Sequence, residues 1–192
     1  MSLEKIRTVI QSSIDVKKEI FRSESILKQI ETLANFCLQS LKSDGKIIFA
    51  GNGGSFADSQ HLAAEFISRL QFDRAPLASV ALGTNSSSTT AIGNDYGYDQ
   101  IFVRELKAIA RSGDIYIPIT TSGNSQNILA TIETAKSLKL HVVGLTGESG
   151  GKLKDLVECI RIPSNRTERI QESHIMIGHI ICGLVEDNYF LK

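Results

Sequence analysis

Five short runs of β-branched and other apolar residues, separated by longer and more polar stretches, constrain the fold of this chain more than any other feature. Within a run almost every residue is apolar, as in strands that are buried on both faces, and each intervening stretch is long enough for a helix. The pattern predicts an α/β doubly wound fold, with a parallel sheet covered by helices on both faces. The predicted strands span residues 47–50, 79–82, 115–119, 141–145 and 159–162.

Pro118 lies inside the third of these runs. Proline lacks the N–H group that a strand donates to its neighbour, and it is therefore expected at the edge of a sheet. For the third strand, the apolar run predicts a buried position, whereas the proline predicts an edge position.

Two helical segments precede the first strand, and another follows the last. Apolar residues from Ile26 to Leu41 recur at helical spacing after Ser23, the candidate N-cap. The apolar stripe of segment 3–20 is too thin to be buried well by one small domain alone. We therefore expect this segment to pack on another subunit. The stretch 169–189 is again helical in period. We therefore divide the chain into N-terminal helices that pack onto the domain and other subunits, 1–44, and one structural unit, 45–192.

Composition narrows the classes of partner. A chain of 192 residues with 42% hydrophobic residues can form one domain with a full core. Its 21 basic and 21 acidic residues balance, so we expect neither nucleic acid nor a membrane as a partner.

The first residues resemble neither a signal peptide nor a spanning segment, and a cytoplasmic location follows as the expectation. The cysteines are widely spaced and are predicted to be reduced core residues: Cys37, Cys159 and Cys182.

Two predicted strands run directly into polar turns that contain glycine, at residues 51–55 and 120–125. In a parallel sheet both turns lie at the carboxyl edge, where open α/β folds bind ligands. Glycine lets the backbone approach an anion, a helix N-terminus offers N–H donors, and hydroxyls add further donors. The two turns together predict a site for a monophosphate. The alternative is that they are ordinary tight turns and helix caps.

A nucleotide site is a weaker interpretation of the same residues. Gly51, Asn52 and Gly53 begin like the dinucleotide fingerprint, but its third glycine would fall at Phe56. The next strand ends without a carboxylate for a ribose, and the chain has no Gly-Lys-Ser or Gly-Lys-Thr sequence. Both a Rossmann cofactor and a P-loop are disfavoured.

His61 and Glu65 stand four residues apart on the helix expected after the first loop, so both side chains share one face, which Arg69 extends. Such a pair can bind a metal or supply a general base, although a solvated helix face is the commoner explanation. The late helix adds polar residues in an apolar setting: Gln171, Glu172, His174 and His179. Spacing does not select between the two histidines, and Gln171 is on general grounds a poor metal ligand.

Taken together, several motifs resemble the phosphoheptose isomerases of the sugar isomerase (SIS) family. The resemblance runs from about residue 20 to the end and keeps the order and spacing of the motifs. They are Gly51-Asn52-Gly53-Gly54-Ser55, His61, Glu65, Gly93-Asn94-Asp95, Thr121-Ser122-Gly123-Asn124-Ser125 and Arg169-Ile170-Gln171-Glu172 followed by His179.

The resemblance implies a single SIS domain with a flavodoxin-like sheet, and a homotetramer with sites between subunits. It implies conversion of sedoheptulose 7-phosphate to D-glycero-D-manno-heptose 7-phosphate for bacterial lipopolysaccharide or capsule. It further implies one Zn²⁺ per subunit, with His61, Glu65, Gln171 and His179 as ligands. The implied substrate contacts are Asn52, Gly53, Gly54, Glu65, Asn94, Asp95, Thr120, Thr121, Ser122, Ser125 and Gln171, and Ser55 is a further phosphate donor. Many relatives are expected to carry serine where this chain has Thr120, and the hydroxyl is kept.

Aldose–ketose isomerisation moves a proton between adjacent carbons through an enediol, which needs a base and an acid. Glu65 is the candidate base, His179 the candidate acid, and Asp58 a weaker candidate for a proton shuttle. One competing hypothesis is a non-catalytic SIS protein that binds a replication initiator, in which the positions of Glu65 and His179 are not Glu and His. Another is a SIS sensor or isomerase for a different sugar phosphate.

Overall fold

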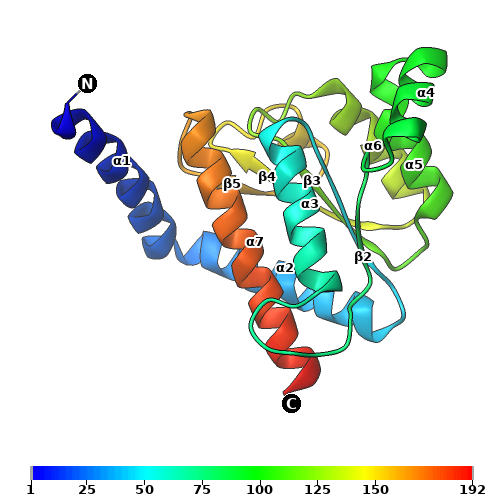
Figure 1. Ribbon diagram of the computed structural model, residues 1–192, viewed down its shortest axis with the longest axis horizontal. Coiled ribbons are helices and arrows are strands. Elements are labelled where there is room, and N and C mark those ends of the chain that lie inside the picture. Colours follow the sequence, from blue (N-terminus) through cyan, green and yellow to red (C-terminus); the bar gives the residue numbers. More distant parts are fainter. Residues whose placement is uncertain (1, 192) are drawn as a thin grey trace.

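A five-stranded, wholly parallel sheet with the strand order β2-β1-β3-β4-β5 forms the centre of the molecule (Figure 1). It is seen in the computed structural model of the chain, which describes residues 2–191. All five predicted strands are confirmed, with ends shifted by no more than two residues. The strands are β1 Ile47–Gly51, β2 Ser79–Ala81, β3 Ile115–Ile119, β4 His141–Gly147 and β5 Glu158–Ile162.

Helices connect the strands and cover both faces of the sheet. Ser23 is the N-cap of the second helix, as predicted, and its hydroxyl accepts the Ile26 N–H at 3.4 Å. The α-helices are α1 Leu3–Arg22, α2 Glu24–Lys42, α3 Gly54–Ile67, α4 Ser86–Tyr96, α5 Ile101–Ile109, α6 Gln126–Ser137 and α7 Thr167–Phe190. Two short 3-10 turns are η1 Tyr98–Gln100 and η2 Leu153–Asp155.

Alternate residues of each strand point to opposite faces of the sheet, and two separate apolar clusters result. In β1, Ile47 and Phe49 pack with α2, α3 and α7, whereas Ile48 and Ala50 pack with α5 and α6. This arrangement explains why the strands are apolar at consecutive positions, and it confirms the predicted doubly wound architecture.

Pro118 lies in β3, the central strand, and is buried. The register with β1 continues through it, and Ala50 is its partner there. The register with β4 includes Ile115, Tyr116 and Ile119 but skips the two residues between them. The missing N–H of the proline is therefore accommodated by a local interruption of one ladder, and β3 keeps its central place.

Helix α1 extends away from the body of the molecule (Figure 1). Polar contacts attach it to the beginning of α7: Ser13 Oγ donates to Glu172 Oε2 at 2.7 Å, and the Arg169 guanidinium donates to the Val9 carbonyl at 2.9 Å. Large apolar side chains nevertheless remain exposed along this helix: Leu3, Ile6, Val9, Ile10 and Ile14. Helix α1 therefore carries apolar surface that the rest of the chain leaves uncovered.

All three cysteines are buried and none forms a disulfide, which agrees with their assignment as core residues. Within residues 2–191, none of the helices combines the length and the apolar character that crossing a membrane requires.

Candidate functional site

The strand order creates a topological switch point between β1 and β3, because the chain continues from β1 to one side of the sheet and from β3 to the other. Ligands of open α/β sheets bind at the carboxyl ends of the strands beside such a point. The loops 51–55 and 120–125 follow β1 and β3 directly. The structure therefore places both predicted loops at the switch point.

Glycines shape the loop after β1. Gly53 is the N-cap of α3 and has a φ of 55°, which favours glycine, and no side chain caps the helix. Gly54 lies against the Gln171 side chain of α7 so closely that a Cβ atom at this position would collide with it. Both glycines are exposed, so an anion can approach this helix N-terminus without meeting a side chain of the loop.

Asn52 is fixed by contacts that the sequence did not predict. Its Nδ2 donates to Asn127 Oδ1 at 2.8 Å, and Asn127 Nδ2 donates to its Oδ1 at 2.9 Å. The Tyr98 hydroxyl donates to the same Oδ1 at 2.9 Å. Asn127 belongs to the first turn of α6 and is only 2% exposed. The two amides thus connect the β1 loop to the helix that begins after the β3 loop.

The loop after β3 is organised by its own hydroxyls. Thr120 Oγ1 and Ser125 Oγ lie 3.1 Å apart, and Ser122 Oγ accepts the Asn124 N–H at 3.1 Å. Ser125 is the N-cap of α6, but its side chain makes no capping hydrogen bond. Thr120 is buried, so its hydroxyl lies inside the loop against Ser125, whereas Ser122 is exposed.

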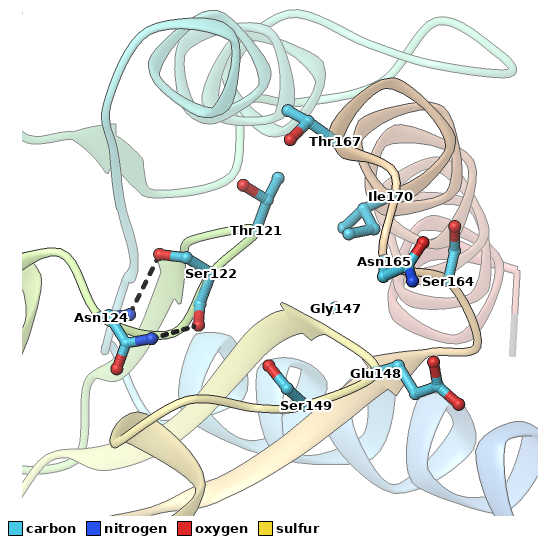
Figure 2. Close-up of a pocket in the computed structure, with 10 residues that line it drawn as sticks. All are labelled: Thr121, Ser122, Asn124, Gly147, Glu148, Ser149, Ser164, Asn165, Thr167 and Ile170. Carbon is cyan, nitrogen blue, oxygen red and sulfur yellow. Dashed lines mark hydrogen bonds between the residues drawn. The ribbon is translucent and has the colours of Figure 1, made fainter.

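A pocket of about 440 Å³ opens beside this loop (Figure 2). Thr121 and Ser122 line one side of it, and Thr167 and Ile170, from the beginning of α7, line another. The remaining lining residues are Asn124, Gly147, Glu148, Ser149, Ser164 and Asn165. A smaller cavity of about 120 Å³ lies at Asn52 and Gly53. Hydroxyl and amide side chains line most of the larger pocket, whereas Phe56, Ile101 and Phe102 form much of the wall of the smaller cavity.

Three residues from the sequence analysis meet on the layer formed by α3 and α7. His61 Nε2 lies 2.8 Å from His179 Nε2 and 3.2 Å from Glu65 Oε1. One ligand atom from each of the three side chains lies within 4.8 Å of the others. His61 is about half exposed and the Glu65 side chain is 19% exposed. The structure therefore brings a carboxylate and two imidazoles together at an accessible position.

His174, the other histidine of this helix, has a different environment. It is fully buried, and its Nε2 lies 3.2 Å from the Thr146 carbonyl oxygen. Burial lowers the pKa of His174 to about 4, and the contact with the Thr146 carbonyl opposes this only in part. His174 is a neutral core residue, whereas His179 lies in the cluster.

The cluster fits a tetrahedral metal ion. Two nitrogen or oxygen ligands about 2.0–2.1 Å from Zn²⁺ stand about 3.3 Å apart in tetrahedral geometry, close to the separations seen here. Two imidazoles and a carboxylate are also a common donor set for zinc. The fourth implied ligand, Gln171, precedes His179 by eight residues, or about 12 Å along the helix axis, and its amide packs against Gly54.

Asp58 lies one turn before His61 on α3. Its Oδ2 is buried and has no hydrogen-bond partner among the described residues. Burial raises the pKa of Asp58 to about 6, and nearby His61 opposes this shift. A carboxyl group that changes charge near neutral pH thus stands beside the cluster.

Other residues from the sequence analysis lie elsewhere. Asn94 and Asp95 are exposed on α4, where the Asn94 amide donates to Asp95 Oδ1 at 2.7 Å, and neither lines the two cavities. Ser55 is buried beneath the β1 loop. Arg69 does not extend the face of His61 and Glu65 as expected, because α3 ends at Ile67.

Comparison with known proteins gives the class first. Residues 10–147 match the SIS domain family, so the chain belongs to that family. Its fold and its polar switch-point loops are consistent with this class.

Relatives within the family narrow the assignment. A phosphoheptose isomerase of Aneurinibacillus thermoaerophilus is 52% identical over 186 residues, which cover 96% of this chain and 94% of that protein. Phosphoheptose isomerase 2 of Campylobacter jejuni is 48% identical and covers 94% of this chain and 90% of its own. The solved structure of a phosphoheptose isomerase from Francisella tularensis superimposes with a TM-score of 0.92 at 35% identity, covering 97% and 99% of the two chains. The chain is therefore a member of the phosphoheptose isomerases, a group of aldose–ketose isomerases.

Proposed function

We propose that this protein converts sedoheptulose 7-phosphate to D-glycero-D-manno-heptose 7-phosphate. The observation that carries the proposal is the meeting of Glu65 and His179 with His61, within 3.2 Å at each contact, in a chain whose relatives bear the name of this enzyme. A protein that only binds a sugar phosphate or another protein needs no paired base and acid.

The chemistry follows from the two groups. Glu65 removes a proton from C1 of the open-chain ketose, and the electron pair forms the C1–C2 double bond while His179 protonates the oxygen on C2. Glu65 then returns its proton to C2, and His179 recovers a proton from the oxygen on C1, which leaves the aldose. Each group is expected to contribute about 10²- to 10⁴-fold to the rate.

The switch-point loops would hold the far end of the substrate. Their donors are uncharged hydroxyls, amides and backbone N–H groups, which bind a phosphate and use remote binding energy to orient the reacting carbons. The proposed contacts are Asn52, Gly53, Gly54, Ser55, Glu65, Asn94, Asp95, Thr120, Thr121, Ser122, Ser125 and Gln171.

A metal ion is part of the proposal. His61, Glu65 and His179 would hold Zn²⁺, with Gln171 as a fourth ligand. When bound, the ion would polarise the substrate carbonyl. With the ion bound, Glu65 would hold it through one carboxylate oxygen and would accept the proton from C1 on the other.

The first test is to incubate the purified protein with sedoheptulose 7-phosphate, with and without added zinc, and to follow aldose formation by NMR. We expect the manno-heptose phosphate to appear, and its rate to fall on chelation and to recover with zinc. Absence of product from folded, metal-loaded protein would reject the proposal. Turnover of a hexose phosphate in the same assay would then assign the site to another sugar, and binding without turnover would indicate a sensor or binding protein.

We further propose a homotetramer in which the N-terminal helices, within residues 1–44, make subunit contacts. The exposed apolar side chains of α1 support it, since such a row on one helix face is normally covered. Light scattering on a sizing column should give about four times the 21.0 kDa mass of the chain. An Ile10→Glu variant should shift to smaller species, because a charge would enter the covered face.

Thr8→Glu is the control for this experiment, because Thr8 is exposed on the opposite side of α1. It should leave the assembly unchanged. A wild-type monomer, or equal behaviour of the two variants, would contradict the role given to α1.

The proposed location is the cytoplasm, and the proposed use of the product is bacterial heptose for lipopolysaccharide or capsule.

A further inference from the structure

The end of α3 is held by an arginine that lies outside the helix. The last four carbonyl groups of a helix have no partner within it. Here the Arg74 guanidinium donates to two of them, from Nη2 to the Glu65 carbonyl at 2.7 Å and from Nη1 to the Phe66 carbonyl at 2.6 Å. Arg74 therefore binds the backbone of Glu65, the candidate base.

The same arginine is bound to α7 through Glu186. Arg74 Nε donates to Glu186 Oε1 at 2.8 Å, and the carboxylate also accepts the Leu70 N–H at 3.0 Å and the Gln71 N–H at 2.8 Å. The side chains of Arg74 and Glu186 are only 3% and 1% exposed. Burial alone would raise the pKa of Glu186, but the two N–H donors and the guanidinium outweigh it and hold that pKa below its usual value.

Glu186 follows His179 on α7 by seven residues, so the two side chains lie two turns apart on the same face. The ion pair thus joins the backbone at Glu65 to the helix that carries His179. About one turn before Glu65, Leu62 of α3 lies so close to Gly178 of α7 that a Cβ atom at Gly178 would collide with it. The two helices are in close contact at Gly178 and are bound together at Arg74. Both contacts fix the position of α3 along the axis of α7.

We propose that Arg74 and Glu186 are positioning residues for the isomerisation, which set the place of Glu65 relative to His179. The inference rests on the proposed function. The pair touches neither the substrate nor the reacting atoms, and it acts through the backbone of Glu65. A misplacement of about 1 Å between reacting groups can cost on the order of a hundredfold in rate, so a small shift of α3 against α7 is enough for a large effect.

The chain contains a matched control for a merely structural role. Asp114 is also 1% exposed, and it also accepts two backbone N–H groups, of Lys46 at 2.9 Å and Arg111 at 2.7 Å. The third donor to Asp114 is again a cation, Lys46 Nζ at 2.6 Å. This pair lies at the amino edge of the sheet, before β1 and β3, and therefore away from the carboxyl-edge loops.

The experiment compares Glu186→Gln with Asp114→Asn in the full-length protein. We expect similar losses of melting temperature, since each change removes one charge from an equivalent set of donors. For Glu186→Gln, kcat should fall roughly 10- to 100-fold with KM changed by less than about threefold, whereas kcat of Asp114→Asn should stay within about twofold of wild type. Equal kcat values for the two folded variants would overturn the proposal.

Zinc affinity gives a readout that does not need turnover. Displacement of Glu65 from His179 should weaken zinc binding of Glu186→Gln by about 10-fold or more, as outer-shell changes commonly do, and Asp114→Asn should bind as wild type does. An inactive wild-type protein would reject the proposed function, while the zinc titration would still decide on the positioning role. Equal zinc affinities would contradict that role.

If Glu186→Gln does not fold, Arg74→Lys takes its place. Lysine keeps the positive charge beside Glu186, but a single ammonium group cannot also reach the Glu65 and Phe66 carbonyls in the arrangement of the guanidinium. The same loss of kcat and of zinc affinity is expected. Wild-type values for both in folded Arg74→Lys would overturn the proposal.

Discussion

A Glu65→Gln variant is expected to lose about 10²- to 10⁴-fold in kcat while remaining folded, because the amide keeps the size of the side chain but cannot accept the proton from C1. The side chain is only partly buried and its partner in the cluster is His61, so the fold does not depend on its charge. Steady-state kinetics with sedoheptulose 7-phosphate, together with a thermal melt and the zinc content of the purified variant, measure the effect.

Glu133→Gln, the same change on an exposed part of α6, is the control and should keep kcat within about twofold of wild type. Zinc content separates the two roles of Glu65. If the variant holds zinc and is inactive, the lost function is that of the base; if excess zinc restores turnover, its role is that of a ligand. Turnover near the wild-type rate in a folded, zinc-loaded variant would show that Glu65 is not the base.

A His179→Asn variant is expected to lose about 10²- to 10³-fold in kcat, because it removes the acid that acts at the substrate oxygens. It also removes one of the three side chains that meet within 4.8 Å, so zinc affinity should fall as well. Kinetics at saturating zinc isolate the loss of the acid, and a zinc titration measures the loss of the ligand.

His141→Asn is the matched control, since this histidine begins β4 at the opposite edge of the sheet and packs against the Phe36 ring at a centroid distance of 3.8 Å. It should retain both turnover and zinc affinity. If the two variants behave alike, the cluster is not the reaction centre and another acid has to be sought near the loops.

The strands could be predicted because the signal for each is local. A strand buried on both faces is apolar at consecutive positions whatever its partner is, and the five runs were therefore recognisable without knowledge of the strand order. The helix caps and polar turns were recognisable for the same reason. Pro118 is the exception: its effect depends on which neighbour its missing N–H faces, and only the assembled sheet shows that the ladder to β4 is interrupted there.

The parts of the site that sequence did not predict depend on contacts between distant residues. Asn127 and Tyr98 reach Asn52 across 75 and 46 positions, and neither belongs to a motif. Helix α3 ends before Arg69, and its last turn is bound by Arg74, which in turn binds Glu186 of α7. These contacts join residues far apart in the sequence. Spacing alone left His174 and His179 equivalent, and burial separates them.

The two halves of the proposed site are built in different ways. The switch-point loops offer largely backbone groups and small hydroxyls that the turn itself presents, whereas the cluster consists of three side chains on α3 and α7. Substitution of one or two of these side chains would change the reaction and leave the anchoring of the sugar phosphate in place. A lineage that inherits this scaffold can therefore gain or lose chemistry in few mutational steps, so that catalysts and non-catalytic sensors can descend from one ancestor without rebuilding the fold.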